Sequence, residues 1–109
     1  MVRNFRSHSA LLSLPARLYY QGDLKPCANQ ELVNSCLGWD GLTPAARERE
    51  IPLLVHGVVG QDRRDAASPS FYNLEEIMLV EKYVTDLLQN SGLGLEEEMI
   101  GVIAPYRYL

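Results

Sequence analysis

Two apolar runs separated by an amphipathic segment constrain the fold of this chain more than any other feature. Residues 51–59 and 99–104 are apolar almost throughout, which is the pattern of strands buried on both faces of a parallel sheet. Between them, Ile77, Val80 and Val84 recur at helical spacing. A strand, a helix and a second strand in this order predict an α/β fold, in which ligands bind at the carboxyl ends of parallel strands.

The helix between the two runs has well-marked ends. Asn73 and Glu76 form a near-match to a capping box, and Gly92 follows the last apolar position. The position of Glu75 and Glu76 at a helix start therefore explains them better than a role as candidate general bases does. The apolar stripe of this helix consists of Ile77, Val80, Tyr83, Val84, Leu87 and Leu88.

A second helix is predicted close to the beginning of the chain, directly after residues that resemble the end of a strand. Its apolar stripe is Leu11, Leu14 and Leu18, widened by Leu12 and Tyr19. Ser7 or Ser9 is the expected cap, and Pro15 is expected to kink or restart the helix because proline removes one backbone hydrogen bond.

The segment Asn4-Phe5-Arg6-Ser7-His8 lies where this helix begins, and two interpretations of it are open. An aromatic ring beside a guanidinium suits a nucleotide: Phe5 stacks on a base, and Arg6 donates paired hydrogen bonds to a terminal phosphate. In the other interpretation, Phe5 belongs to the core and Arg6 is solvated at the helix start. The local residues alone favour this second interpretation, because short motifs occur often by chance.

Charge and composition exclude several classes of protein. The net charge of −4 argues against a stand-alone basic nucleic-acid module. The first twenty residues nevertheless contain Arg3, Arg6 and Arg17 and no acid, which indicates an anion-facing end. The spacing of Cys27 and Cys36 fits no zinc pattern, so no metal site is predicted. No apolar run of about 18 residues and no secretion signal is present, and the default prediction is the cytoplasm.

The remaining polar positions give weaker signals. His56 lies within the first apolar run, and a structural histidine with one satisfied nitrogen is favoured over a catalytic base. Residues 60–72 alternate in charge and predict a solvated loop. Trp39 is expected to cover an edge of the core, and Asn29 to cap a short helix that closes at Gly38.

Taken together, the two ends of the chain resemble part of the second RecA-like domain of a superfamily-one RNA helicase of the up-frameshift type. The family motif N-Y/F-R-S-H matches residues 4–8, and its I-G-V-I-T/A-P-Y segment matches residues 100–106. Residues 11–20, 37–39 and 68–73 resemble the Armitage branch, also called the Moloney-leukaemia-virus-ten-like helicases. The resemblance implies a partial RecA-like domain of the P-loop NTPase helicase C-terminal type, with parallel strands and flanking helices.

The resemblance also implies roles for residues at both ends. Phe5 would stack on the adenine of ATP, and Arg6 would be the catalytic arginine that reaches the terminal phosphate. The residues implied to contact RNA are Ala104, Pro105, Tyr106 and Arg107. The family commonly has Tyr at position 5 and often Thr at position 104. Phe5 keeps the ring, whereas Ala104 lacks a hydroxyl that could bond RNA.

Other helicase motifs are not present in these 109 residues. The sequence has no Gly-x-x-x-x-Gly-Lys-Ser/Thr loop and no acidic magnesium motif. Residues 1–109 are therefore predicted to be a partial second RecA-like domain, truncated at both ends, with Met1 an internal residue or a mispredicted start. The magnesium of ATP would be held by the missing first domain, and the isolated fragment is predicted to be inactive.

The implied partners are single-stranded RNA, the missing first RecA-like domain and proteins of a silencing complex, with no membrane. The implied role is RNA translocation or unwinding in small-RNA-mediated silencing or mRNA regulation, in the cytoplasm or in RNA granules. Two alternatives stay open: a truncated non-enzymatic α/β interaction module, and an unrelated small α/β binding domain. Strands without the rest of their sheet expose edges, so marginal stability and a tendency to associate are predicted.

Overall fold

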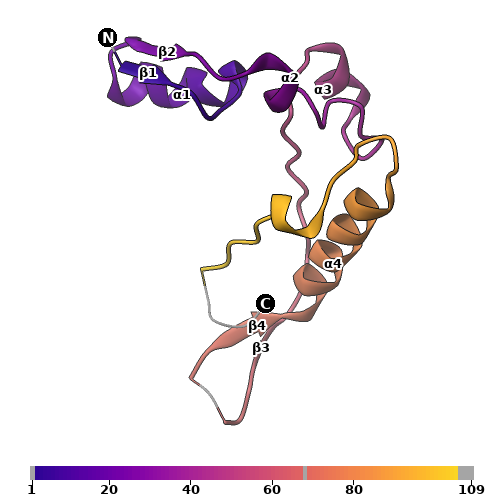
Figure 1. The fold of residues 1–109 in the computed structure, drawn as a ribbon. Helices are drawn as coiled ribbons and strands as arrows, with labels where there is room; N and C mark the ends of the chain where they lie inside the picture. The colour runs from indigo at the N-terminus through magenta and orange to yellow at the C-terminus, as the bar shows by residue number, and fades with distance from the viewer. Residues whose placement is uncertain (1, 68, 106–109) are drawn as a thin grey trace. The chain divides into compact units, whose positions relative to one another are not determined.

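The computed structural model describes residues 2–67 and 69–105, which form two compact units (Figure 1). The first unit is Met1–Val55 and the second is His56–Leu109. Within the described ranges, no helix combines the length and the apolar character needed to cross a membrane.

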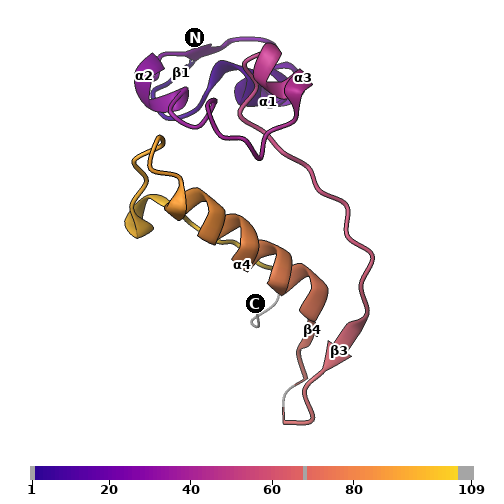
Figure 2. The ribbon, with the colours of Figure 1, turned by 90° about the vertical axis from the view of Figure 1, so that its right-hand side faces the viewer.

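The first unit begins with a parallel strand pair. β1 (Val2–Asn4) pairs with β2 (Leu24–Pro26), and α1 (Ser9–Tyr19) lies between them in the chain (Figures 1 and 2). A helical crossover is the usual connection of parallel strands, and α1 packs against β2. The prediction that the first residues end a strand that leads into a helix is thereby confirmed. The pair is compatible with the predicted α/β class.

The buried face of α1 differs from the predicted one. Leu12 and Ala16 are buried, and His8, one turn before Leu12, is buried with them. Leu14 and Leu18 are more than half exposed, at 52% and 60%, so of the predicted apolar face the unit buries only Leu12. Both stripes have helical spacing, and spacing alone does not say which of two neighbouring stripes meets the core.

The cap of α1 is also not the predicted one. Neither Ser7 nor Ser9 caps the helix; the Nδ1 atom of His8 accepts a hydrogen bond from the amide of Ala10 at 3.0 Å. The imidazole supplies the acceptor that a helix start needs, while its ring is buried. Pro15 lies inside α1, which is assigned as one helix from Ser9 to Tyr19 without a restart.

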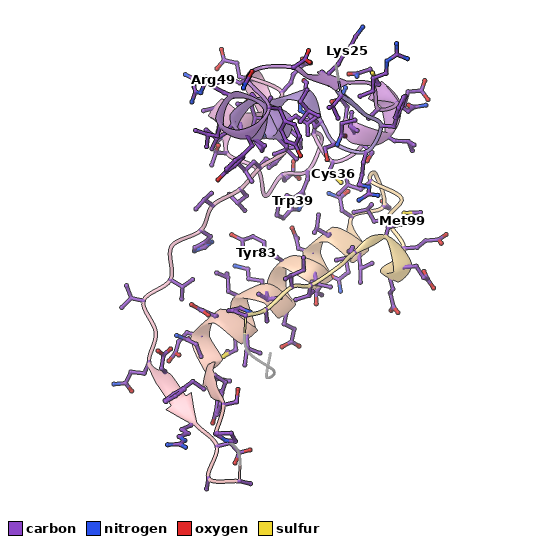
Figure 3. The ribbon with its side chains drawn as sticks, turned by 90° about the vertical axis from the view of Figure 1, so that its left-hand side faces the viewer. Lys25, Cys36, Trp39, Arg49, Tyr83 and Met99 are labelled. Carbon is purple, nitrogen blue, oxygen red and sulfur yellow. The ribbon has the colours of Figure 1, made fainter. Side chains whose placement is uncertain are left out.

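Two short helices complete the first unit. Asn29 caps α2 (Gln30–Val33) as predicted, although the helix ends before Gly38. Thr43 caps α3 (Pro44–Glu48), which begins with proline at a position where a missing amide proton does no harm. Trp39 and Leu42 in the intervening turn are buried, which agrees with the prediction that Trp39 covers an edge of the core. Figure 3 labels Trp39.

The end of α3 carries a strained residue and gives a testable stability prediction. Glu50 has φ +55°, and the amide of Ile51 donates to the carbonyl of Ala46, which is the hydrogen-bond pattern of a Schellman motif. Glycine has no Cβ to clash in this left-handed conformation. Glu50→Gly should therefore stabilise the unit by about 0.5–1 kcal/mol, after subtraction of the added entropy of the unfolded chain.

Chemical denaturation of purified protein measures this change in the free energy of unfolding. Glu50→Ala serves as the control, because alanine keeps the strained backbone and removes the same carboxylate. Equal stabilities of the glycine and alanine variants would show that the backbone conformation of residue 50 is not the source of the strain.

The second unit contains a hairpin and the longest helix. β3 (Asp62–Arg64) pairs antiparallel with β4 (Phe71–Asn73), and α4 (Leu74–Gln89) follows β4 directly (Figures 1 and 2). The prediction that residues 60–72 form only a loop is therefore wrong. The short 3₁₀-helix η1 (Glu97–Met99) comes after α4.

Neither of the two predicted buried strands is present in the described chain. Residues 51–61 and 100–104 belong to no helix or strand, and Val59 and Ile103 are almost fully exposed at 101% and 96%. A strand exists only where a second strand supplies the other half of its hydrogen bonds. An apolar run predicts that burial is favourable, but it does not supply that partner.

The predicted helix is confirmed at α4. Asn73 accepts a hydrogen bond from the amide of Glu76 at 3.1 Å, so the cap is the predicted residue. The apolar stripe of α4 is only half-buried, and no described residue of the second unit is fully buried. The described part of this unit thus has a long amphipathic helix without a closed core beneath it.

Candidate nucleotide and RNA contact residues

The junction between β1 and α1 is held by one asparagine side chain. The Oδ1 atom of Asn4 accepts hydrogen bonds from the amides of Arg6 and Ser7, at 3.0 and 2.9 Å. This is an Asx turn, in which a side chain closes the backbone at the point where the strand ends. Together with the His8 cap, it fixes the backbone of residues 4–10 by local hydrogen bonds.

Phe5 and Arg6 both lie exposed on this fixed junction. The ring of Phe5 is 71% exposed, which contradicts the interpretation of Phe5 as a core residue. The guanidinium of Arg6 forms no ion pair with any residue that the structure describes. An open aromatic face and a free guanidinium at the carboxyl end of a strand are chemically suited to a base and a phosphate.

A polar hollow borders the N-terminus of α1. It has a volume of about 320 Å³, and its lining residues are His8, Ser9, Ala10, Gln30, Asn34, Arg49 and Glu50. The Oδ1 atom of Asn34 is buried without a hydrogen-bond partner. Another lining residue, Arg49, is labelled in Figure 3. No pattern in the sequence predicts this grouping, because residues 34 and 49 reach α1 only through the fold of the unit.

The residues predicted to contact RNA lie in the second unit. Ala104 is half-buried and Pro105 is exposed, and both line a hollow of about 710 Å³ together with Phe71, Asn73 and Ile77. Tyr106 and Arg107 lie outside the described residues. Phe5 and Arg6 belong to the other unit, so the predicted shared edge between the two ends of the chain stays a prediction.

His56 has the satisfied nitrogen that the sequence favours, but its ring is exposed and lies in no strand. Its Nδ1 atom shares a hydrogen bond with the hydroxyl of Tyr83 on α4, and the two rings meet edge to face with centroids 5.7 Å apart. Figure 3 labels Tyr83 on this helix. The imidazole thus has one satisfied nitrogen, and it helps to tie the extended segment to α4.

The hairpin carries interactions that the sequence did not predict. Arg63 pairs with Glu75 at 3.8 Å, and the guanidinium carbon of Arg64 lies 5.8 Å from the centre of the Phe71 ring. Cross-strand register brings Arg64 to Phe71, whereas Glu75 reaches Arg63 from the first turn of α4. Their spacing in the sequence gives no such signal.

A parallel strand pair joined by a helix, with an exposed ring and guanidinium after the first strand, is an arrangement found in nucleotide-binding α/β proteins. The chain belongs to the AAA domain family, whose family model matches residues 1–108. The resemblance to up-frameshift-type helicases of the Armitage branch is confirmed by its relatives. No solved structure matches the chain.

Three relatives define the position of the chain within this family. It is 41% identical over 107 residues to the RNA helicase Mov10l1 of Mus musculus, covering 98% of this chain and 9% of the relative. It is 39% identical over 110 residues to the putative helicase MOV-10 of Gallus gallus. That match covers 95% of this chain and 11% of the relative. The helicase SEN1 of Saccharomyces cerevisiae is more distant, at 27% identity over 104 residues. That match covers 94% of this chain and 4% of the relative. The chain thus spans about a tenth of the length of the first two relatives.

Proposed function

We propose that residues 1–109 are part of the second RecA-like domain of an ATP-dependent RNA helicase. The observation that carries this proposal is the exposed Phe5–Arg6 pair on the fixed β1–α1 junction. It occurs in a chain of the AAA domain family whose relatives are named as RNA helicases. In this proposal the chain supplies the second-domain half of an ATP site and part of an RNA face.

The two junction residues have separate tasks toward ATP. The open face of Phe5 stacks on the adenine, and the ring contributes binding without any need for a hydrogen bond. Arg6 donates its paired N–H groups to the terminal phosphate and stabilises the charge that develops there during transfer. Hydrolysis then depends on the position of Arg6, so closure of the two RecA-like domains controls the reaction.

The remaining half of the site belongs to a first RecA-like domain outside these residues. A phosphate-cradling loop and acidic residues in that domain would hold the other phosphates and magnesium. Because residues 1–109 contain neither motif, this segment by itself does not hydrolyse ATP in our proposal.

RNA would bind at the end of the second apolar run. Ala104 and Pro105 line a hollow of the second unit, and Tyr106 and Arg107 follow them in the sequence. Stacking on an aromatic ring and contact with a phosphate are the two elements of single-strand binding. Ala104 contributes shape only, because its side chain has no hydrogen-bonding group.

The cellular role that we propose is taken from the helicase branch that the sequence resembles. The proposed work is translocation along single-stranded RNA in small-RNA-mediated silencing or mRNA regulation, in the cytoplasm or in RNA granules. Its partners would be RNA, the first RecA-like domain and proteins of a silencing complex.

A second candidate function is a truncated, non-enzymatic interaction module. The exposed side chains of Val59 and Ile103 favour this alternative, since apolar residues without a core are suited to association. The genomic sequence on both sides separates the two functions. In-frame helicase motifs upstream and downstream support the helicase, and stop codons on both sides support the module.

Phe5 gives a direct test of the nucleotide half of the proposal. In the full-length protein, Phe5→Ala should raise KM for ATP about tenfold, because base–aromatic stacking is worth about 1–3 kcal/mol. Phe5→Tyr keeps the stacking ring and should leave KM close to that of the wild type. Steady-state ATP hydrolysis with saturating RNA measures both. An unchanged KM in Phe5→Ala would remove Phe5 from the ATP site.

A further inference from the structure

We propose that the β3–β4 hairpin is a second contact site for single-stranded RNA, where Phe71 stacks on one base and Arg64 binds the adjoining phosphate. This inference rests on the proposed function and places RNA contacts outside residues 104–107. Neither the family motifs nor the sequence pattern assigns a ligand to the hairpin.

The geometry of the hairpin supplies a stacking platform. Arg64 and Phe71 are direct cross-strand partners, so their side chains leave the ribbon on the same face. The guanidinium carbon of Arg64 lies 5.8 Å from the centre of the Phe71 ring, within cation–π distance. Phe71 is still 46% exposed, so much of its surface is available to a ligand.

Arg64 is the hairpin cation that remains free for a phosphate. Its neighbour Arg63 is engaged by Glu75 at 3.8 Å, whereas Arg64 forms no ion pair with a described residue. The nearby acids have their own donors. Asp65 accepts from the amide of Ala67 at 3.1 Å, and Asp62 accepts from the side-chain amide of Asn73 at 3.5 Å.

The hollow beside the hairpin fits a base better than a phosphate. Phe71 lines this space of about 710 Å³ together with Ala104 and Pro105, the residues proposed to contact RNA. Asp62 and Glu76 also line it. Carboxylates repel phosphate but accept N–H groups from base edges. The chemistry therefore directs the base into the hollow and leaves its phosphate at the exposed Arg64.

The test compares two ligands in fluorescence anisotropy titrations of the full-length protein. One is a short single-stranded RNA, and the other is an abasic ribose-phosphate oligomer of equal length. Phe71→Ala and Phe71→Leu should each weaken binding of RNA about tenfold and leave binding of the abasic oligomer unchanged. Arg64→Ala should weaken binding of RNA and of the abasic oligomer by similar factors, because both ligands contain the phosphate that Arg64 contacts.

The controls are an exposed aromatic and an exposed arginine that belong to the first unit, whereas the hairpin belongs to the second. Tyr19→Ala on α1 and Arg47→Ala on α3 should bind both ligands like the wild type. Equal losses for both ligands in the Phe71 variants, or no loss at all, would overturn the hairpin site. If the wild-type protein binds RNA in these titrations and hydrolyses ATP in a separate steady-state assay, the proposed function stays intact. The failure of the hairpin site and the failure of the proposed function are therefore distinguishable.

Discussion

Arg6→Ala is expected to lower RNA-stimulated ATP hydrolysis of the full-length protein by about 10³-fold, while the affinity for RNA stays within about twofold of the wild type. The guanidinium of Arg6 is exposed and forms no ion pair with a described residue, so its loss breaks no ion pair that the structure describes. An arginine that stabilises charge only during transfer lowers kcat when it is removed. Single-turnover hydrolysis measures that step, and anisotropy with labelled RNA measures binding.

Two further variants sharpen this experiment. Arg6→Lys should recover only a small part of the activity, because an ammonium cannot offer the paired donors of a guanidinium. Arg17→Ala removes an exposed arginine at the end of α1 and should be fully active. Wild-type turnover in Arg6→Ala would refute the role of Arg6 and leave the family membership untouched.

Trp39→Ala is expected to cause the largest loss of stability, about 3–5 kcal/mol in the first unit. Trp39 is 7% exposed and is the largest of the four buried apolar side chains described in this unit, with Leu12, Ala16 and Leu42. Truncation of such a ring leaves a cavity in a small core. Amide hydrogen exchange over residues 2–55 of the full-length protein measures the loss as faster exchange of α1.

Two further variants test whether the loss of stability in Trp39→Ala comes from lost core packing or simply from the removal of an aromatic ring. Tyr19→Ala removes a ring that is 79% exposed and should change exchange little. Gly41→Ala tests the same core from the other side, because a Cβ at position 41 would overlap the Trp39 ring; its expected loss is about 1–3 kcal/mol. Protection of α1 equal to the wild type in both Trp39→Ala and Gly41→Ala would show that Trp39 does not hold this unit together.

Predictions that depend on neighbours in the chain agreed well with the structure. Asn73 caps α4 and Asn29 caps α2, because a cap joins a side chain to amides two or three residues away. The motif at residues 4–8 also belongs to this class, since the Asn4 turn is closed within three residues. These contacts form from the local sequence. The cap of α1 is the exception, because His8 supplies the acceptor there in place of Ser7 or Ser9.

Predictions that depend on distant residues were less successful. The apolar stripe assigned to Leu14 and Leu18 is exposed, and the buried face of α1 is that of Leu12 and Ala16. Residues 62–64 and 71–73 pair in a hairpin that their charges did not suggest. The hollow that joins Phe71 to Ala104 has no signal in sequence spacing.

The sequence by itself determined the family, the caps of α2 and α4 and the residues that carry the candidate ATP contacts. Only the tertiary structure decided that Phe5 is exposed, which face of α1 is buried, and that residues 51–61 form no strand. The physical reason is the range of the interactions. Helical hydrogen bonds and caps connect residues at most a few positions apart, whereas burial and strand pairing require partners that the chain brings together only when it folds.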